Sequence, residues 1–187
     1  SYSMPIQTPI CDFGQKALPF ELKSTDNKII SLDNIKGENG TLIMFICNHC
    51  PYVKAVTKEI VEDCNELKKI GINSVAICSN DAVNYPDDSF DNMIKFSNDN
   101  QFNFPYLQDE TQEIAKAYDA ICTPDFFGYN KDLGLQYRGR LRELKNFVPV
   151  KDGESDLLKA MKQIAETGKG PQNQIPSAGC GIKWKYN

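Results

Sequence analysis

The decapeptide Phe45-Ile-Cys-Asn-His-Cys-Pro-Tyr-Val-Lys54 decides the fold. It overlaps the apolar run from Thr41 to Ile46, which is typical of a strand buried on both faces. Proline is favoured in the first turn of a helix, so we expect a helix to begin at Pro51. Apolar residues then recur with a helical period until Gly71, where the helix is expected to end. The segment therefore predicts a buried strand, a loop with two cysteines and a histidine, and a helix.

Cys50 immediately precedes this helix, at its N-cap position. Unpaired backbone N–H groups and the positive end of the helix dipole favour an anion there, so the pKa of Cys50 should fall. Its neighbour His49 is the only histidine of the chain and could add positive charge or a hydrogen bond. The other interpretation is that Cys50 merely caps the helix and that His49 is a solvated loop residue. We predict that Cys50 is a nucleophile and the most reactive of the cysteines.

Two further interpretations of the loop involve Cys47. A Cys-x-x-Cys dithiol requires Cα atoms within about 7 Å, whereas three extended residues would separate Cys47 from Cys50 by roughly 10 Å if Cys47 belongs to the strand. A metal site could use Cys47, His49 and Cys50, but structural zinc sites normally have four ligands. The other cysteines are solitary in the sequence. The sequence therefore predicts no metal and no cofactor.

The rest of the chain predicts alternating strands and helices. An N-terminal hairpin is expected over residues 19–32, followed after the central segment by a strand at 73–78, a helix at 90–98, an extended segment at 104–107, a helix at 110–118, strands at 126–129 and 135–140, and a helix at 157–166. This order predicts an α/β fold with a central mixed sheet flanked by helices. We expect one domain over residues 1–187, with its core at about 18–167 and a C-terminal tail at 168–187.

Composition excludes several classes of function. Lys and Arg number 21 against 25 Asp and Glu, so a nucleic-acid partner is not expected. Arg138, Arg140 and Arg142 are expected to share one strand face, which is either solvated or a site for an anion or a partner. The longest apolar run has six residues, Leu42 to Cys47, whereas a membrane span needs about 20.

The seven cysteines are odd in number and irregularly spaced. With no secretory signal visible, we expect a cytoplasmic protein with mostly free thiols. Met4 is a candidate natural start, which would make residues 1–3 an added segment.

The stretch from Leu18 to Arg140 resembles the thioredoxin-fold redoxins of the alkyl hydroperoxide reductase/thiol-specific antioxidant superfamily. The resemblance rests on the entry hairpin LPFELKSTDNKIISLDNIKG, on TLIMFICNHCPYVK, and on the segment from FPYLQDE to the hairpin ending at Arg140. Within that superfamily, NHCPYVK, CTPDFF and the terminal GC-x-IKW resemble one subgroup of thioredoxin-like proteins. The resemblance implies a thioredoxin-like fold with an N-terminal hairpin extension.

The resemblance also assigns residues to the site. The nucleophile position falls on Cys50, and the cis-proline of the facing loop falls on Pro124, after Thr123. The second cysteine of a thioredoxin is replaced by Val53, and the threonine that precedes a peroxiredoxin cysteine by three residues is replaced by Cys47. No arginine lies in the Thr-Pro loop. Both departures argue against a peroxidase, because these groups polarise the O–O bond.

The leading hypothesis is a thiol-disulfide oxidoreductase with Cys50 as nucleophile. Its substrate would be a protein or small-molecule disulfide, and an external thiol would restore it. The alternatives are an atypical peroxiredoxin acting on a peroxide and a thiol-bearing binding module without turnover. A resolving thiol is expected outside the Cys50 helix, with Cys180 on a mobile arm as first candidate and Cys122 as second; Cys47, Pro51 and Cys78 are expected near the site. GCGIKWKY could instead dock structurally through Ile182 and Trp184.

Overall fold

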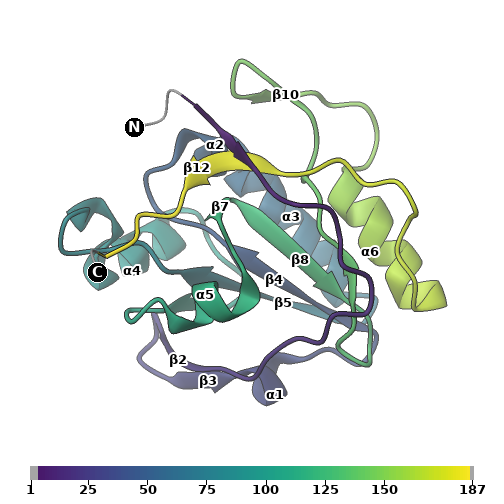
Figure 1. Ribbon diagram of the computed structural model, residues 1–187, viewed down its shortest axis with the longest axis horizontal. Coiled ribbons are helices and arrows are strands. Elements are labelled where there is room, and N and C mark those ends of the chain that lie inside the picture. Colours follow the sequence, from purple (N-terminus) through teal and green to yellow (C-terminus); the bar gives the residue numbers. More distant parts are fainter. Residues whose placement is uncertain (1–3, 186–187) are drawn as a thin grey trace.

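The computed structural model describes residues 4–185 and contains a seven-stranded mixed sheet in the order β3-β2-β6-β5-β4-β8-β9 (Figure 1). The interpretation of residues 1–3 lies outside the described residues. β4 (Gly40–Phe45) is an interior strand, paired parallel to β5 (Ile72–Cys78), the middle strand of the seven, and antiparallel to β8 (Asp125–Tyr129). All of its residues are buried, as predicted from its continuous apolar sequence.

The remaining strands complete the sheet on both sides. They are β2 (Glu21–Ser24), β3 (Ile29–Ser31), β6 (Tyr106–Gln108) and β9 (Leu135–Tyr137). β2 and β3 form the predicted N-terminal hairpin at one edge of the sheet. A separate short hairpin joins β10 (Leu144–Lys145) to β11 (Val148–Pro149). The predicted mixed α/β fold is confirmed.

Helices cover both faces of the sheet (Figure 1). One face packs against α3 (Thr57–Lys68) and α6 (Asp156–Thr167), which contribute Leu67, Leu157 and Met161 to one apolar cluster. The other face packs against α1 (Leu32–Ile35) and α5 (Glu113–Tyr118). α4 (Phe90–Asp99) follows a 3-10 turn, η1 (Pro86–Asp88), beside β6. No helix among residues 4–185 is long and apolar enough to cross a membrane.

The helix predicted from Pro51 to Gly71 is two helices in the structure. The short α2 (Pro51–Lys54) ends before α3 begins at Thr57. At the break the carbonyl of Val53 accepts from the backbone N–H of Val56 at 3.0 Å and from the Thr57 hydroxyl at 2.7 Å. The apolar period continues across the break, which explains why the pattern predicts a single helix.

The prediction of a solvated arginine face is wrong. β9 ends at Tyr137, and the arginines that follow it are in ion pairs with acidic side chains. Arg138 pairs with the buried Asp125, while Arg142 donates to both carboxylate oxygens of Glu59 at 2.8 and 2.9 Å. Alternation predicts a shared face but cannot reveal that a buried carboxylate lies opposite.

The C-terminal segment is not a loose tail. β12 (Ala178–Gly181) pairs antiparallel with both β1 (Ile6–Gln7) and β7 (Cys122–Thr123), forming a second small sheet. Beyond β12, Ile182 is buried in the second apolar cluster, whereas Trp184 is 39% exposed. The prediction of a structural latch is therefore confirmed for Ile182, and the swinging arm is replaced by a docked strand.

Candidate functional site

Cys50 lies at the point predicted, at the N-cap of α2. Pro51 occupies the first helical position, as expected, and both Val53 and Lys54 donate backbone N–H groups to the Cys50 carbonyl. The side chain of Cys50 is fully buried, so it is neither a solvated cap nor an exposed thiol. Its Sγ lies 3.4 Å from the carbonyl oxygen of Thr123, across the space between α2 and β7.

Two other cysteine thiols contact Cys50, and we call Cys47, Cys50 and Cys180 the thiol cluster. A hydrogen bond from Cys47 is the main influence that lowers the pKa of Cys50 to about 5, against the opposing effect of burial. The Cys180 side chain and the backbone N–H groups of Val53 and Cys180 lower this pKa further. The cluster therefore favours one thiolate, held by two neutral thiols.

The two donor thiols differ in their electrostatic surroundings. Burial, together with Asp88 nearby, raises the pKa of Cys47 well above its ordinary value. Burial and the hydrogen bond to Cys50 raise the pKa of Cys180 to about 12, but the Lys183 ammonium opposes that rise. Cys180 thus has a cation that favours its thiolate, whereas Cys47 has an anion that disfavours it.

The distance argument against a Cys47–Cys50 contact does not apply, because β4 ends at Phe45 and Cys47 lies beyond it. The chain bends at Asn48 and His49, which brings the Cys47 thiol to Cys50. Cys47 Sγ also lies 3.4 Å from the hydroxyl of Thr123. The loop therefore holds two adjacent thiols, which a strand continuing to Cys47 would have separated.

Thr123 and Pro124 face the thiol cluster, as the resemblance implied, and the peptide bond between them is cis. β12 occupies the backbone edge beside this bond, with Cys180 paired to Thr123. In Figure 1 this strand lies between β1 and β7, next to α2. The chain thus presents its own cysteine at that edge.

Among the described residues, Cys122 and Cys78 form no hydrogen bond with Cys50, although burial, Asp125 and the charge of Cys50 all raise the pKa of Cys122. Cys122 is buried, and its Sγ lies 3.7 Å from the Pro124 carbonyl oxygen. Cys78 ends β5 as predicted, and burial raises its pKa to about 12. The structure thus brings the Cys47 and Cys180 thiols to Cys50, whereas the Cys122 thiol contacts the carbonyl of Pro124.

His49 is paired with a residue that the sequence did not single out. Its Nδ1 lies 2.8 Å from a carboxylate oxygen of Asp88, and its ring stacks on Tyr85 with an angle of 6° between the planes. Asp88 is buried and also accepts from the backbone N–H of Asn48 at 2.8 Å and from Asn80 at 2.9 Å. Nothing in the NYPDD segment signals this contact, which depends on how η1 packs beside the loop.

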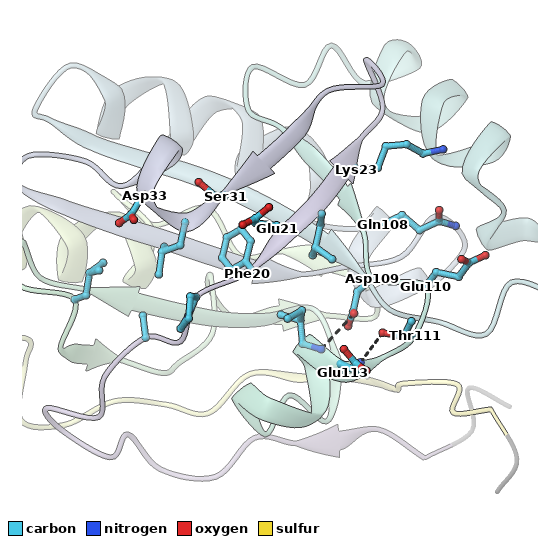
Figure 2. A pocket seen from close by; sticks show the side chains of 16 residues that line it. Phe20, Glu21, Lys23, Ser31, Asp33, Gln108, Asp109, Glu110, Thr111 and Glu113 are labelled. Carbon is cyan, nitrogen blue, oxygen red and sulfur yellow. Dashed lines mark hydrogen bonds between the residues drawn. The ribbon is translucent and has the colours of Figure 1, made fainter.

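Two cavities lie in different places relative to the thiols. A cavity of about 830 Å³ is lined by residues of β2, α1 and α5 and of the segments before β2 and between β6 and α5, with acidic side chains such as Glu21 and Glu113 (Figure 2). Neither this cavity nor the second, smaller one has a cysteine in its lining. The lining of a smaller cavity of about 230 Å³ includes Pro124 of the site. It also includes Tyr52 and Ala178, which lie two residues from Cys50 and Cys180 in the sequence. The smaller cavity is the one that adjoins the site.

The depressed Cys50 pKa predicts a pH-dependent stability. A thiol with an ordinary pKa of 9.0 and a folded-state pKa of about 5 leaves more protons on the unfolded chain between those values. Its contribution to stability is therefore fully present above pH 9 and is lost as pH falls towards 5. We expect the free energy of unfolding of the reduced protein, minus that of Cys50→Ser, to increase from pH 5.5 to pH 8, by at most about 1.4 kcal/mol per pH unit. A difference that stays constant or falls would contradict the assignment of the thiolate.

Gly179 allows β12 to lie close to β7. A Cβ at this position would lie 2.0 Å from the Thr123 carbonyl oxygen, so a side chain requires β12 to move. We expect Gly179→Ala to lower the free energy of unfolding by about 1–3 kcal/mol and to reduce formation of a Cys50–Cys180 disulfide. Gly134→Ala is the control, because its nearest neighbour would be 3.5 Å away. Urea unfolding tests the prediction, and equal effects of the two substitutions would contradict it.

Comparison with solved structures gives close likenesses over nearly the full chain. An uncharacterized conserved protein from Geobacillus kaustophilus is 43% identical, with a TM-score of 0.91 and coverage of 98% of each chain. A hypothetical protein from Sinorhizobium meliloti 1021 is 30% identical, with a TM-score of 0.89 and coverage of 98% of this chain and 100% of that one.

A more distant likeness identifies the fold. The thioredoxin domain of a thiol-disulfide oxidoreductase from Bacteroides vulgatus has a TM-score of 0.58 at 13% identity, covering 72% of this chain and 89% of that one. No curated protein sequence matches the chain significantly. The model of the AhpC/TSA family matches residues 13–143. Because this match spans more than half of the sequence, the chain belongs to the AhpC/TSA family, and its fold is thioredoxin-like.

Proposed function

We propose that the protein is a thiol-disulfide oxidoreductase in which the Cys50 thiolate attacks a disulfide sulfur. The observation that supports this most directly is the thiol cluster itself, in which Cys47 and Cys180 hydrogen bond to a Cys50 whose pKa is lowered to about 5. A thiolate at neutral pH is the species that performs thiol-disulfide exchange. A second thiol already in contact can then complete the reaction.

The proposed cycle has two exchange steps. Cys50 attacks a substrate disulfide, forms a mixed disulfide and releases the first substrate half as a thiolate, which takes up a proton. Cys180 then loses its proton, attacks Cys50 Sγ and releases the second half, so the substrate is reduced and a Cys50–Cys180 disulfide forms. An external thiol returns this disulfide to two thiols. The Lys183 ammonium supports Cys180 in this role, because it favours the thiolate needed for the second attack.

Cys47 has a different role in this proposal. It donates a hydrogen bond to the Cys50 thiolate and stays protonated, because burial and Asp88 both disfavour its charged form. It therefore stabilises the nucleophile, at the position where the resemblance places a threonine. Thr123, Pro124 and His49 belong to the walls of the site rather than to the exchange itself.

Substrate choice follows from the arginines and the cavities. The chain has three arginines, Arg138, Arg140 and Arg142, and each is in an ion pair with a carboxylate. Arg140 and Arg142 line the cavity beside Tyr52 and Pro124, but their charges are already neutralised by Asp156 and Glu59, which disfavours polarisation of a peroxide O–O bond. We propose a disulfide substrate that enters by way of the cavity beside Tyr52 and Pro124.

The proposal also includes the cellular compartment, the extent of the domain and the partners of the protein. Seven free cysteines support a reducing compartment, which we take to be the cytoplasm. Residues 1–187 are proposed to act as one domain, with β12 completing the site. The partners are a disulfide-bearing protein or small molecule and an external thiol reductant, with no role for nucleic acid or a membrane.

The test exposes the reduced protein to a glutathione-based mixed disulfide and, separately, to hydrogen peroxide, and follows Cys50 by mass spectrometry. We expect a transient adduct on Cys50 with the disulfide, followed by a Cys50–Cys180 crosslink. Rapid sulfenic acid at low peroxide, without comparable disulfide exchange, would replace the proposal with a peroxidase. Inertness to both reagents would indicate a binding module and contradict the proposal.

A further inference from the structure

A second group of potential ligands overlaps the thiol cluster. The Cys47 sulfur, one ring nitrogen of His49 and one carboxylate oxygen of Asp88 all lie within 4.8 Å of one another. Cys47 and Asp88 are buried, and His49 is half-buried. The Cys50 sulfur is hydrogen bonded to Cys47. The structure thus groups one sulfur, one imidazole and one carboxylate, and the neighbouring Cys50 sulfur would complete the four ligands of a tetrahedral zinc site.

The charges of this group favour a cation. The buried Asp88 carboxylate forms an ion pair with His49. The three arginines are paired with other carboxylates. A divalent ion would neutralise the buried Asp88 carboxylate and would bind the cysteine sulfurs as thiolates.

The contacts around Asp88 and His49 also resemble those that hold metal ligands in place. Asp88 is held by Asn48 and Asn80, and His49 is stacked on Tyr85. Such outer contacts fix the orientation of a ligand before the metal arrives. The partial exposure of His49 gives an ion a path to the group from solvent.

We propose that Cys47, Cys50, His49 and Asp88 form a binding site for a borderline-soft divalent cation such as Zn²⁺. Tetrahedral ligation places ligand atoms roughly 3.3–3.8 Å apart, so small side-chain rotations would close Cys47, His49 and Asp88 around an ion, and Cys50 would turn its sulfur towards it as the fourth ligand. The metal uses the nucleophilic Cys50 sulfur and the Cys47 sulfur that stabilises its thiolate. Binding of the ion therefore switches off the Cys50 nucleophile, and formation of a Cys50 disulfide abolishes metal binding.

The sequence alone argues against such a site, because it supplies three candidate ligands in one loop and no fourth. Asp88 is the fourth ligand, and it lies 40 residues from Asn48, the loop residue whose backbone N–H it accepts. The site depends on the packing of η1 against the loop, so the spacing of residues in the sequence does not indicate it.

The test titrates the fully reduced protein, freed of reductant under anaerobic conditions, with Co²⁺ and then displaces Co²⁺ with Zn²⁺. We expect one equivalent to bind, with sulfur-to-cobalt charge-transfer absorption and the intense visible bands of tetrahedral cobalt. His49→Gln and Asp88→Asn should each weaken binding at least about tenfold. Asp63→Asn, another buried carboxylate, is the matched control and should leave binding unchanged.

Several outcomes would overturn the site. One is binding that needs millimolar Co²⁺. Another is equal affinity in wild type and in the His49 and Asp88 variants. A third is loss of binding in Cys180→Ser while Asp88→Asn has no effect. Because Asp88 is buried, the half-buried His49 provides a variant less prone to misfolding. Disulfide exchange is measured separately on metal-free protein. Absence of metal binding would therefore leave the proposed function intact, and absence of disulfide exchange would leave the metal site intact.

Discussion

Replacing Cys50 with serine is expected to lower the rate of disulfide exchange by at least roughly a thousandfold, the largest effect of any single substitution in this chain. A serine hydroxyl has no accessible anion at neutral pH, whereas the Cys50 pKa of about 5 leaves the sulfur almost entirely as thiolate. The measurement is the initial rate of release of a chromogenic thiol from its mixed disulfide, at pH 7 and with excess substrate.

Two variants make this experiment specific. Cys11→Ser is the matched control, since Cys11 is half-buried, interacts with Asp12, Arg138 and Gln174 rather than with the thiol cluster, and has a pKa raised by burial to about 11. It should retain wild-type activity. Cys180→Ser should still react once and then accumulate the mixed disulfide, because the resolving thiol is missing. Equal rates in Cys50→Ser and wild type would exclude Cys50 as the nucleophile.

Replacing Cys47 with alanine is expected to raise the pKa of Cys50 substantially, because the Cys47 thiol is the main influence that lowers it. Below the new pKa, each unit of increase lowers the thiolate population about tenfold. The exchange rate at pH 6 should therefore fall by about the same factor, while the rate above pH 9 changes much less. Thiolate absorbance at 240 nm, followed against pH in the variant and in wild type, gives the pKa without requiring a reagent to reach the buried sulfur.

Cys47→Ser separates the donor role from a redox role. Serine keeps a hydroxyl donor, so it should restore much of the low pKa and the rate although it cannot form a disulfide. If both Cys47 variants lose the second exchange step while keeping the low Cys50 pKa, then Cys47 rather than Cys180 resolves the mixed disulfide. That result would reverse the roles assigned to the two thiols.

The sheet, its flanking helices and the position of Cys50 could be predicted because they are encoded locally. A buried strand, a proline at the first helical position and a glycine at a helix end each leave a signal within a few residues. The single long helix was predicted wrongly because apolar periodicity continues through Ala55 and Val56, where the helix breaks. The solvated arginine face was wrong because its buried partners, such as Glu59, are far away in the sequence.

The thiol cluster could be predicted only in part. Cys50 and the facing Thr123-Pro124 loop followed from the motif and its resemblance. The contact with Cys180 depends on β12 pairing with β7, and no turn or period in the Gly- and Pro-containing segment before it signals a strand. Asp88 was missed for a similar reason, since an acidic loop residue is ordinarily solvated and only its packing beside Asn48 makes it part of the site.

Oxidation of the reduced protein with limiting diamide, followed by peptide mapping under non-reducing conditions, tests the central claim most directly. The account predicts that the first disulfide to form joins Cys50 to Cys180, the thiol hydrogen bonded to it on β12. Persistence of a free Cys50 while other cysteines are oxidised would contradict the claim that Cys50 and its neighbouring thiols form the redox centre.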